Sequence, residues 1–183
     1  LRTPGTANVV IKSTGYNDSA VSQTINAGSV TSLEVTTQPV PGTANGNTFG
    51  TQPVVKLKDQ YGNYCTTGVS STNNVVATAK AGTSAWTIGG TTTKAASGGT
   101  ATFTDLTCTL VVEGNGAITF VVGEVKADST TFTIPINPAK TLTSDTTSNS
   151  VDNDIEITFA EDAAFRSGIT SITYNGNTLT ASQ

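Results

Sequence analysis

The feature of this sequence that most constrains its fold is a series of short runs in which apolar and polar residues alternate. Such alternation places apolar side chains on one face of a β-strand and polar side chains on the other. Gly, Pro, Asn and Asp residues separate the runs, and no stretch sustains the 3.6-residue period of an amphipathic helix. The chain is therefore predicted to be all-β.

The composition limits the size of the core and the kinds of partner. Hydrophobic residues make up 36% of the 183 residues, which suits thin two-layer sandwiches with polar outer faces. Only 12% of the residues are charged and the net charge is −4, which argues against nucleic-acid binding. No apolar run approaches the roughly 20 residues of a membrane span, so we expect no membrane insertion.

The sequence contains no His, the commonest general base and a common metal ligand. Ser and Thr are abundant, but a hydroxyl nucleophile needs a base to activate it. Paired carboxylates would need a cleft to act as a catalytic pair. We therefore predict that the protein is not an enzyme and needs no catalytic cofactor.

Turn-rich boundaries divide the chain into three predicted parts. Residues 1–28 hold two strand candidates and read as the closing half of a β module. Residues 29–135 hold about seven strand candidates with turns at the spacing of a sandwich, and residues 89–99 are expected to be a flexible stretch. A stiff connector from Ile134 to Lys140 contains Pro135 and Pro138. Residues 136–183 read as the opening half of another module.

The segment from Asp59 to Asn63, DQYGN, is predicted to be a tight turn after a strand. Asp59 is expected to accept hydrogen bonds from the amides just ahead of it, and Gly62 is expected to supply a positive φ. The rival interpretation is a calcium loop, but one Asp and one Asn fall short of the six to eight oxygens that calcium prefers.

Three further groups of residues are candidates for a site. Cys65 and Cys108 fit no zinc pattern and are either a disulfide or two buried thiols; we predict that they lie close enough to bond. Trp86 is a candidate sugar-stacking platform, although a core position is the simpler interpretation. Asp152, Asp154 and Glu156 are candidates to bind a structural calcium ion. They lie on or near a predicted strand, and the simpler interpretation is that they form its solvated face.

The middle part resembles the bacterial immunoglobulin-like repeats of cell-surface and S-layer proteins. The resemblance rests on TSLEVTTQPVPGTANGNTFGTQPVVKLKDQYGNYC and GTATFTDLTC, in that order and spacing. It implies an immunoglobulin-like β-sandwich over residues 29–135.

The two ends resemble parts of the haemoglobin-interacting domains of Gram-positive surface proteins. The C-terminal part matches the start of that domain, in the segment TLTSDTTSNSVDNDIEITFAEDAAFRSGITSITYNGNTLT. The N-terminal part matches its end, in the segment GTANVVIKSTGYNDSAVSQTI. The chain is accordingly expected to be a window from a longer tandem array of surface modules.

These resemblances imply a non-catalytic structural module of a bacterial cell-surface protein, of the S-layer or cell wall, located outside the cell. The alternatives are an adhesin-type module that binds a host protein or a carbohydrate, or an accessory module of a secreted glycosidase. The expected partners are neighbouring modules of the array, a cell-wall or host ligand, and further copies of the chain. In the last case residues 1–28 of one copy would complete the module opened by residues 139–183 of another.

Overall fold

The computed structural model describes residues 2–110, 114–135, 140–143, 158, 160, 166, 169–174 and 177–179. Strands dominate among these residues, which include a short 3-10 helix, η1 (Val69–Thr72), and the all-β prediction is confirmed. The chain separates into two compact units, Leu1–Asn137 and Pro138–Gln183. No helix among these residues has the length and apolar character needed to cross a membrane.

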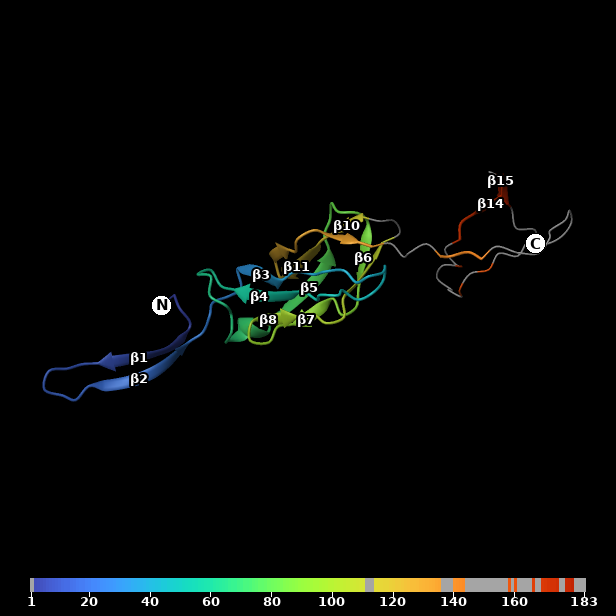
Figure 1. Ribbon diagram of the computed structural model, residues 1–183. Coiled ribbons are helices and arrows are strands. Elements are labelled where there is room, and N and C mark those ends of the chain that lie inside the picture. The colour runs from blue at the N-terminus through green and yellow to red at the C-terminus, as the bar shows by residue number, and fades with distance from the viewer. Residues whose placement is uncertain are drawn as a thin grey trace. The chain divides into compact units, whose positions relative to one another are not determined.

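The first unit begins with an antiparallel hairpin of β1 (Gly5–Ile11) and β2 (Ser19–Ile25) (Figure 1). Seven residue pairs run without interruption from Gly5 opposite Ile25 to Ile11 opposite Ser19. The β-branched residues of both strands favour the extended conformation. The hairpin forms a two-stranded sheet of its own.

The rest of the first unit is a sandwich built on a four-stranded antiparallel sheet. Its strand order is β12 (Val125–Asp128), β11 (Ile118–Val122), β5 (Asn74–Ala79) and β7 (Thr93–Ala95). Apolar residues alternate along β11, where Ile118, Phe120 and Val122 are buried and the residues between them are half-buried. One face of this sheet therefore supplies one wall of the core.

Three smaller sheets complete the sandwich. The first has the order β3 (Ser32–Thr37), β4 (Val54–Lys58) and β8 (Thr100–Thr102). The other two are pairs: β6 (Trp86–Gly89) with β9 (Thr107–Leu110), and β10 (Gly114–Gly116) with β13 (Phe132–Ile134).

One hydrophobic core joins these sheets. Val55 and Leu57 of β4 are fully buried, as are Val75 of β5 and Phe120 of β11. Phe103, just after β8, packs against Phe120 with ring centroids 5.6 Å apart. The predicted apolar positions of the middle part thus meet in a single core, as expected for a two-layer sandwich.

Three strands of the sandwich were not predicted: β7, β10 and β12. β7 lies inside residues 89–99, which the sequence predicted to be flexible. Its sequence, TKA, and that of β10, GNG, lack apolar alternation, so nothing in their pattern marks them as strands. Pairing with β5 and β13 imposes the extended conformation on them.

The second unit contains a hairpin of β14 (Ile172–Tyr174) and β15 (Asn177–Leu179), in which Ile172 lies opposite Leu179. A single bridge joins Thr143 to Thr158. The predicted strand from 154 to 158 lies outside the described residues except for Thr158, and the predicted turn residues Asn175 and Gly176 also lie outside them.

Candidate functional site

Among the predicted candidate residues, those of the DQYGN turn make the most hydrogen bonds. Asp59 Oδ1 accepts hydrogen bonds from the backbone N–H groups of Tyr61 at 2.9 Å and Asn63 at 3.0 Å. Gly62 has a φ of 81°. Both features were predicted, and they confirm the structural turn: the Asp59 carboxylate is occupied by donors from its own loop.

The same turn holds the base of the β1–β2 hairpin. Asp59 Oδ2 accepts a hydrogen bond from Gly28 N–H at 3.2 Å, and Asn63 Nδ2 donates to the carbonyl of Arg2. The Arg2 guanidinium carbon lies 5.7 Å from the centroid of the Tyr61 ring. One loop therefore contacts the residues that flank both ends of the hairpin, which is a consequence that the turn motif alone did not indicate.

A small cavity of about 140 Å³ lies between this loop and the hairpin base. It is smaller than the roughly 300 Å³ at which ligand pockets usually begin. Arg2, Asp59 and Tyr61 line it together with neighbouring residues of the hairpin. The Asp59 carboxylate already accepts hydrogen bonds from Gly28, Tyr61 and Asn63, so the cavity offers no free anionic group.

The surroundings of Asp59 lower its pKa. Burial disfavours the carboxylate and would raise the pKa, but the hydrogen bonds from the Asn63 side chain and from the backbone N–H groups of Gly28, Asn63 and Tyr61 outweigh it. The result is a pKa below the ordinary value of 3.8. A lowered pKa stabilises the fold above the ordinary value, and this contribution is lost as the pH falls through the pKa of the folded state.

We predict that Asp59→Ala lowers the melting temperature by on the order of 10 °C at pH 7, because three backbone N–H groups lose their acceptor. Hydrogen exchange at Gly28 should also become faster. The matched control is Asp105→Ala, which removes a carboxylate that bonds Thr91 in another loop and does not contact the hairpin. An equal loss of melting temperature in the two variants, with Gly28 unaffected, would contradict the anchoring role of Asp59.

Trp86 is a core residue. It is 7% exposed, and its ring lies edge-on to Phe132 with centroids 5.7 Å apart. Its indole N–H donates to Thr83 Oγ1 at 3.3 Å. The candidate role as a sugar-stacking platform is therefore not supported, because stacking needs an exposed ring face and this ring packs inside the sandwich.

Cys65 and Cys108 are both buried and both carry free thiols, so the predicted disulfide is absent from the structure. The backbone N–H of Cys65 bonds Leu57, whereas Cys108 lies in β9 opposite Ile88. Burial raises the pKa of both thiols, and the charge of Asp59 adds to this effect at Cys65. Two buried thiols was the alternative that the sequence analysis left open.

The acidic residues proposed for calcium, Asp152, Asp154 and Glu156, lie outside the described residues. Within the described ranges, no group of three or more His, Cys, Asp or Glu side chains is arranged to hold a metal ion. The calcium site therefore stays a prediction.

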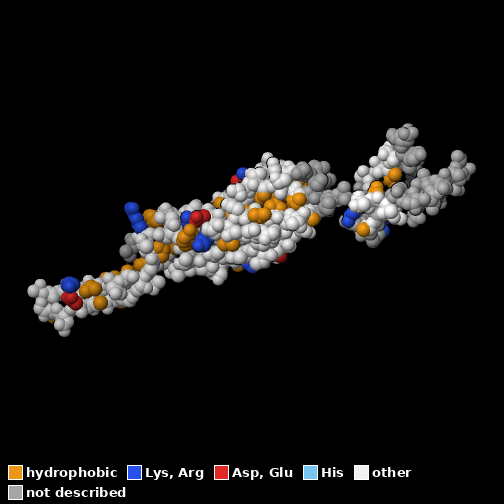
Figure 2. Space-filling view, in the orientation of Figure 1, with side chains coloured by type: hydrophobic (Ala, Val, Ile, Leu, Met, Phe, Trp, Pro, Cys, Tyr) orange, Lys and Arg blue, Asp and Glu red, His pale blue; other side chains and the backbone are white. Residues whose placement is uncertain are grey.

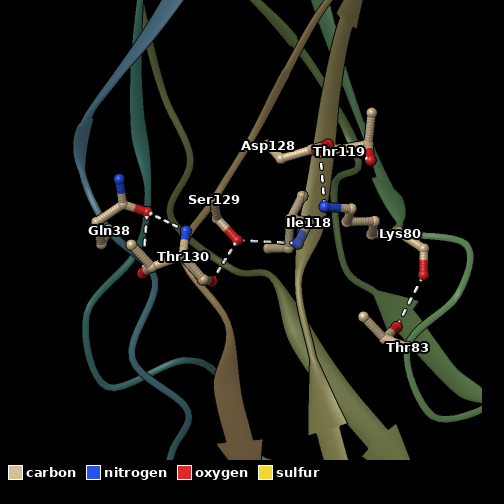
Figure 3. Close-up of polar contacts among 8 residues, drawn as sticks. All are labelled: Gln38, Lys80, Thr83, Ile118, Thr119, Asp128, Ser129 and Thr130. Atoms are coloured by element: carbon tan, nitrogen blue, oxygen red, sulfur yellow. Dashed lines mark hydrogen bonds and ion pairs between the residues drawn. The ribbon is translucent and has the colours of Figure 1, made fainter.

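A network of polar contacts joins the first strand of the sandwich to the last (Figure 3). Gln38 Oε1, just after β3, accepts hydrogen bonds from the Thr130 N–H at 2.9 Å and the Thr130 hydroxyl at 3.3 Å. The buried hydroxyl of Ser129 accepts a hydrogen bond from Ile118 N–H at 2.9 Å and donates to the carbonyl of Thr130. These contacts are structural, since each group is matched to a donor or acceptor within the fold.

A cluster of charged and aromatic side chains covers the outer face of β3 and β4. Lys58 Nζ lies 2.7 Å from Glu34 Oε2, and the Tyr64 hydroxyl donates to the same oxygen at 2.8 Å. The hydrogen bond from Lys58 lowers the pKa of Glu34, followed by that from Tyr64. The hydrogen bond to Glu34 raises the pKa of Lys58. These shifts fix both groups in their charged forms at neutral pH, which does not suit them to proton transfer.

Several large apolar side chains of the β1–β2 hairpin are exposed, and Figure 2 shows hydrophobic side chains on its visible face. The exposed fractions of Val9, Val10 and Ile11 are 50%, 47% and 68%, and that of Val21 is 60%. In the second unit Ile169 and Ile172 are also exposed.

One protein-family model matches the second unit. Residues 142–183 match the family model described as "Heme-binding protein Shr-like, Hb-interacting domain". No curated protein and no solved structure matches the chain. The match overlaps the segment for which the sequence analysis stated a resemblance to haemoglobin-interacting domains, and it leaves the immunoglobulin-like resemblance of residues 29–135 as an expectation.

Proposed function

We propose that this chain is part of a non-catalytic bacterial surface protein whose C-terminal unit binds a host protein, with haemoglobin as the first candidate. The observation that carries the proposal is the match of residues 142–183 to a family described as Hb-interacting. This is the adhesin-type alternative of the sequence analysis, and it has more support than the spacer role that was the main prediction.

The protein part of haemoglobin is a more suitable target for this chain than the haem iron. The sequence has no His and no Met, which are usual haem ligands. Tyr can also bind haem iron, and the chain has four Tyr residues, of which Tyr64 donates its hydroxyl to Glu34. We therefore propose contact with the globin surface through apolar side chains such as Ile169 and Ile172, which are 42% and 59% exposed.

The sandwich of the first unit is proposed to act as a non-catalytic support outside the cell. Its core is continuous, and every buried side-chain polar atom among the described residues has a hydrogen-bond partner. Such a module is suited to act as a spacer in a surface protein.

The test is binding of the immobilised full chain to haemoglobin, with apo-globin and serum albumin in parallel. We expect saturable binding to haemoglobin and apo-globin and none to albumin. Ile172→Asp should weaken the affinity at least about tenfold, as for a residue at the centre of an interface.

The matched control is Val69→Asp, which places the same charge on a 90% exposed residue of η1 in the first unit. Its affinity should equal that of the unchanged chain. Absence of haemoglobin binding, or equal losses in the two variants, would refute the proposal. Binding to haemoglobin but not to apo-globin would instead assign the interaction to the haem.

A further inference from the structure

The β1–β2 hairpin is an incomplete sheet. Two strands of seven residues pair with each other and with no third strand among the described residues, so each presents one unpaired edge. An isolated two-stranded hairpin is only marginally stable in water, and a third strand or a packed face is usually needed. The residues of β2 are exposed except Ile25, which is half-buried, so no packed face compensates.

The edges of this hairpin lack the features that prevent pairing with another chain. Natural edge strands are usually protected by charged residues, by Pro or by bulges. The sequences of β1, GTANVVI, and β2, SAVSQTI, contain no charged residue and no Pro. Their register is also free of bulges. The nearest charges are Lys12 and Asp18, which pair with each other at 3.0 Å beyond the last residue pair.

We propose that β1 pairs antiparallel with β1 of a second copy of this chain, which joins the two hairpins into a four-stranded sheet. β1 is the favoured edge because Val9, Val10 and Ile11 are consecutive β-branched residues and all three are largely exposed. β2 offers only Val21 among strongly exposed apolar residues. The pairing follows two-fold symmetry, the commonest symmetry of homodimers.

The symmetry limits the possible registers to those in which one residue faces its own copy, and the apolar residues select among them. In an antiparallel pair related by a two-fold axis, one residue lies opposite its own copy, and side chains directly opposite each other share a face. When Val10 is that residue, Val9 lies opposite Ile11 of the second copy and Ile11 lies opposite its Val9. Only this register sets all three β-branched residues of one copy against the three of the other.

This pairing also builds an apolar face across the new sheet. Val21 lies opposite Val9 within each hairpin. In the four-stranded sheet the side chains of Val21, Val9 and Ile11 from both copies therefore share one face. In this register only Val9, Val10 and Ile11 of each β1 pair with β1 of the other copy. Such an interface is far smaller than the roughly 20–30 residues of a standard interface, so we expect a weak dimer that forms as the concentration rises.

The first test is the mass of the full chain in solution across a range of concentrations. We expect it to rise from the monomer mass of 18.6 kDa towards twice that value. Val10→Lys should hold the protein at the monomer mass, because two lysines would lie directly opposite each other in the dimer. The matched control is Ser22→Lys, which adds the same charge to the outer strand and should leave the dimer intact.

The second test fixes the register by cross-linking. Residues directly opposite each other in an antiparallel pair have Cα atoms about 4.5–5.5 Å apart, within the range of a disulfide. Mild oxidation should therefore convert V10C to a covalent dimer while S22C remains monomeric. The native thiols are buried in the folded protein and serve as the background in both variants.

Two results would overturn the proposal. A monomer mass at every concentration would show that the hairpin does not associate. A dimer that V10C fails to cross-link would show that another segment covers the hairpin, such as the complementing residues 139–183 expected from the sequence. Neither result depends on haemoglobin binding, so this proposal and the proposed function can fail separately.

Discussion

Phe120→Ala is expected to lower the free energy of unfolding by about 3–5 kcal/mol, the usual cost of removing a fully buried Phe side chain. Phe120 is 0% exposed and lies in β11, at the centre of the four-stranded sheet. Its ring packs on Phe103 from the opposite layer at 5.6 Å. The substitution therefore leaves a cavity between the two walls of the sandwich rather than at its margin.

Urea denaturation followed by Trp86 fluorescence measures this effect, since the only Trp lies in the same core. Val69→Ala is the control: Val69 is 90% exposed and its truncation should change the free energy of unfolding by less than about 0.5 kcal/mol. A loss below about 1 kcal/mol for Phe120→Ala would mean that the two layers do not pack on each other as described.

Gly99→Ala is the second substitution with a large expected effect, of about 2–4 kcal/mol. Gly99 has a φ of 72°, and a Cβ there would lie 2.4 Å from the carbonyl oxygen of Cys65. The left-handed conformation itself costs an Ala about 1 kcal/mol. The clash adds about 1–3 kcal/mol, as for other overpacked sites, because the obstacle is backbone and does not move aside.

Gly82→Ala separates these two contributions. Gly82 has a φ of 82°, but a Cβ there would meet no atom within 4 Å. Its substitution should therefore cost only the conformational part, about 1 kcal/mol. Equal losses of unfolding free energy for Gly82→Ala and Gly99→Ala, measured in the same denaturant titration, would show that the close approach of Gly99 to Cys65 does not affect stability.

The strands that the sequence revealed are those that bury one face. β4, β5 and β11 place an apolar residue at every second position because one side of each faces the core, and all three were predicted. The Asp59 turn was also predictable, because its hydrogen bonds lie within five consecutive residues.

Features that depend on partners distant in the sequence were not predictable. Asn45 lies in a segment with the composition of a loop, yet its amide pairs with both backbone groups of Leu110. Phe49 comes from the same segment and is buried against Phe132. Such contacts are set by the return of the chain about 60 residues or more later, and local composition does not encode that return.

The candidate sites illustrate the same limit. The spacing of Cys65 and Cys108 was compatible with either a disulfide or two thiols. Only the tertiary contacts show that their backbones lie beside different strands, Cys65 beside Leu57 and Cys108 beside Ile88. The ion pair of Lys58 and Glu34 was not predicted. Their ion pair exists because β3 and β4 are adjacent in the sheet, with Glu34 opposite Lys56. That adjacency is a property of topology rather than of sequence pattern.

The link between Gln38 and Thr130 has a mechanical consequence. The chain enters the sandwich beside the Asp59 turn, where Ser32 of β3 lies opposite Lys58, and β3 then runs away from that turn (Figure 1). Gln38 at the far end of β3 holds Thr130, from which the chain continues to β13 and leaves the sandwich. Tension applied to the two ends would therefore load β3 lengthwise. Because the bonds between antiparallel strands are perpendicular to them, tension would strain the β3–β4 bonds together in shear instead of opening them one after another. The lifetime of such a sandwich under load is set by its unfolding rate. Shear loading of the β3–β4 bonds keeps that rate low, because all of these bonds must break together.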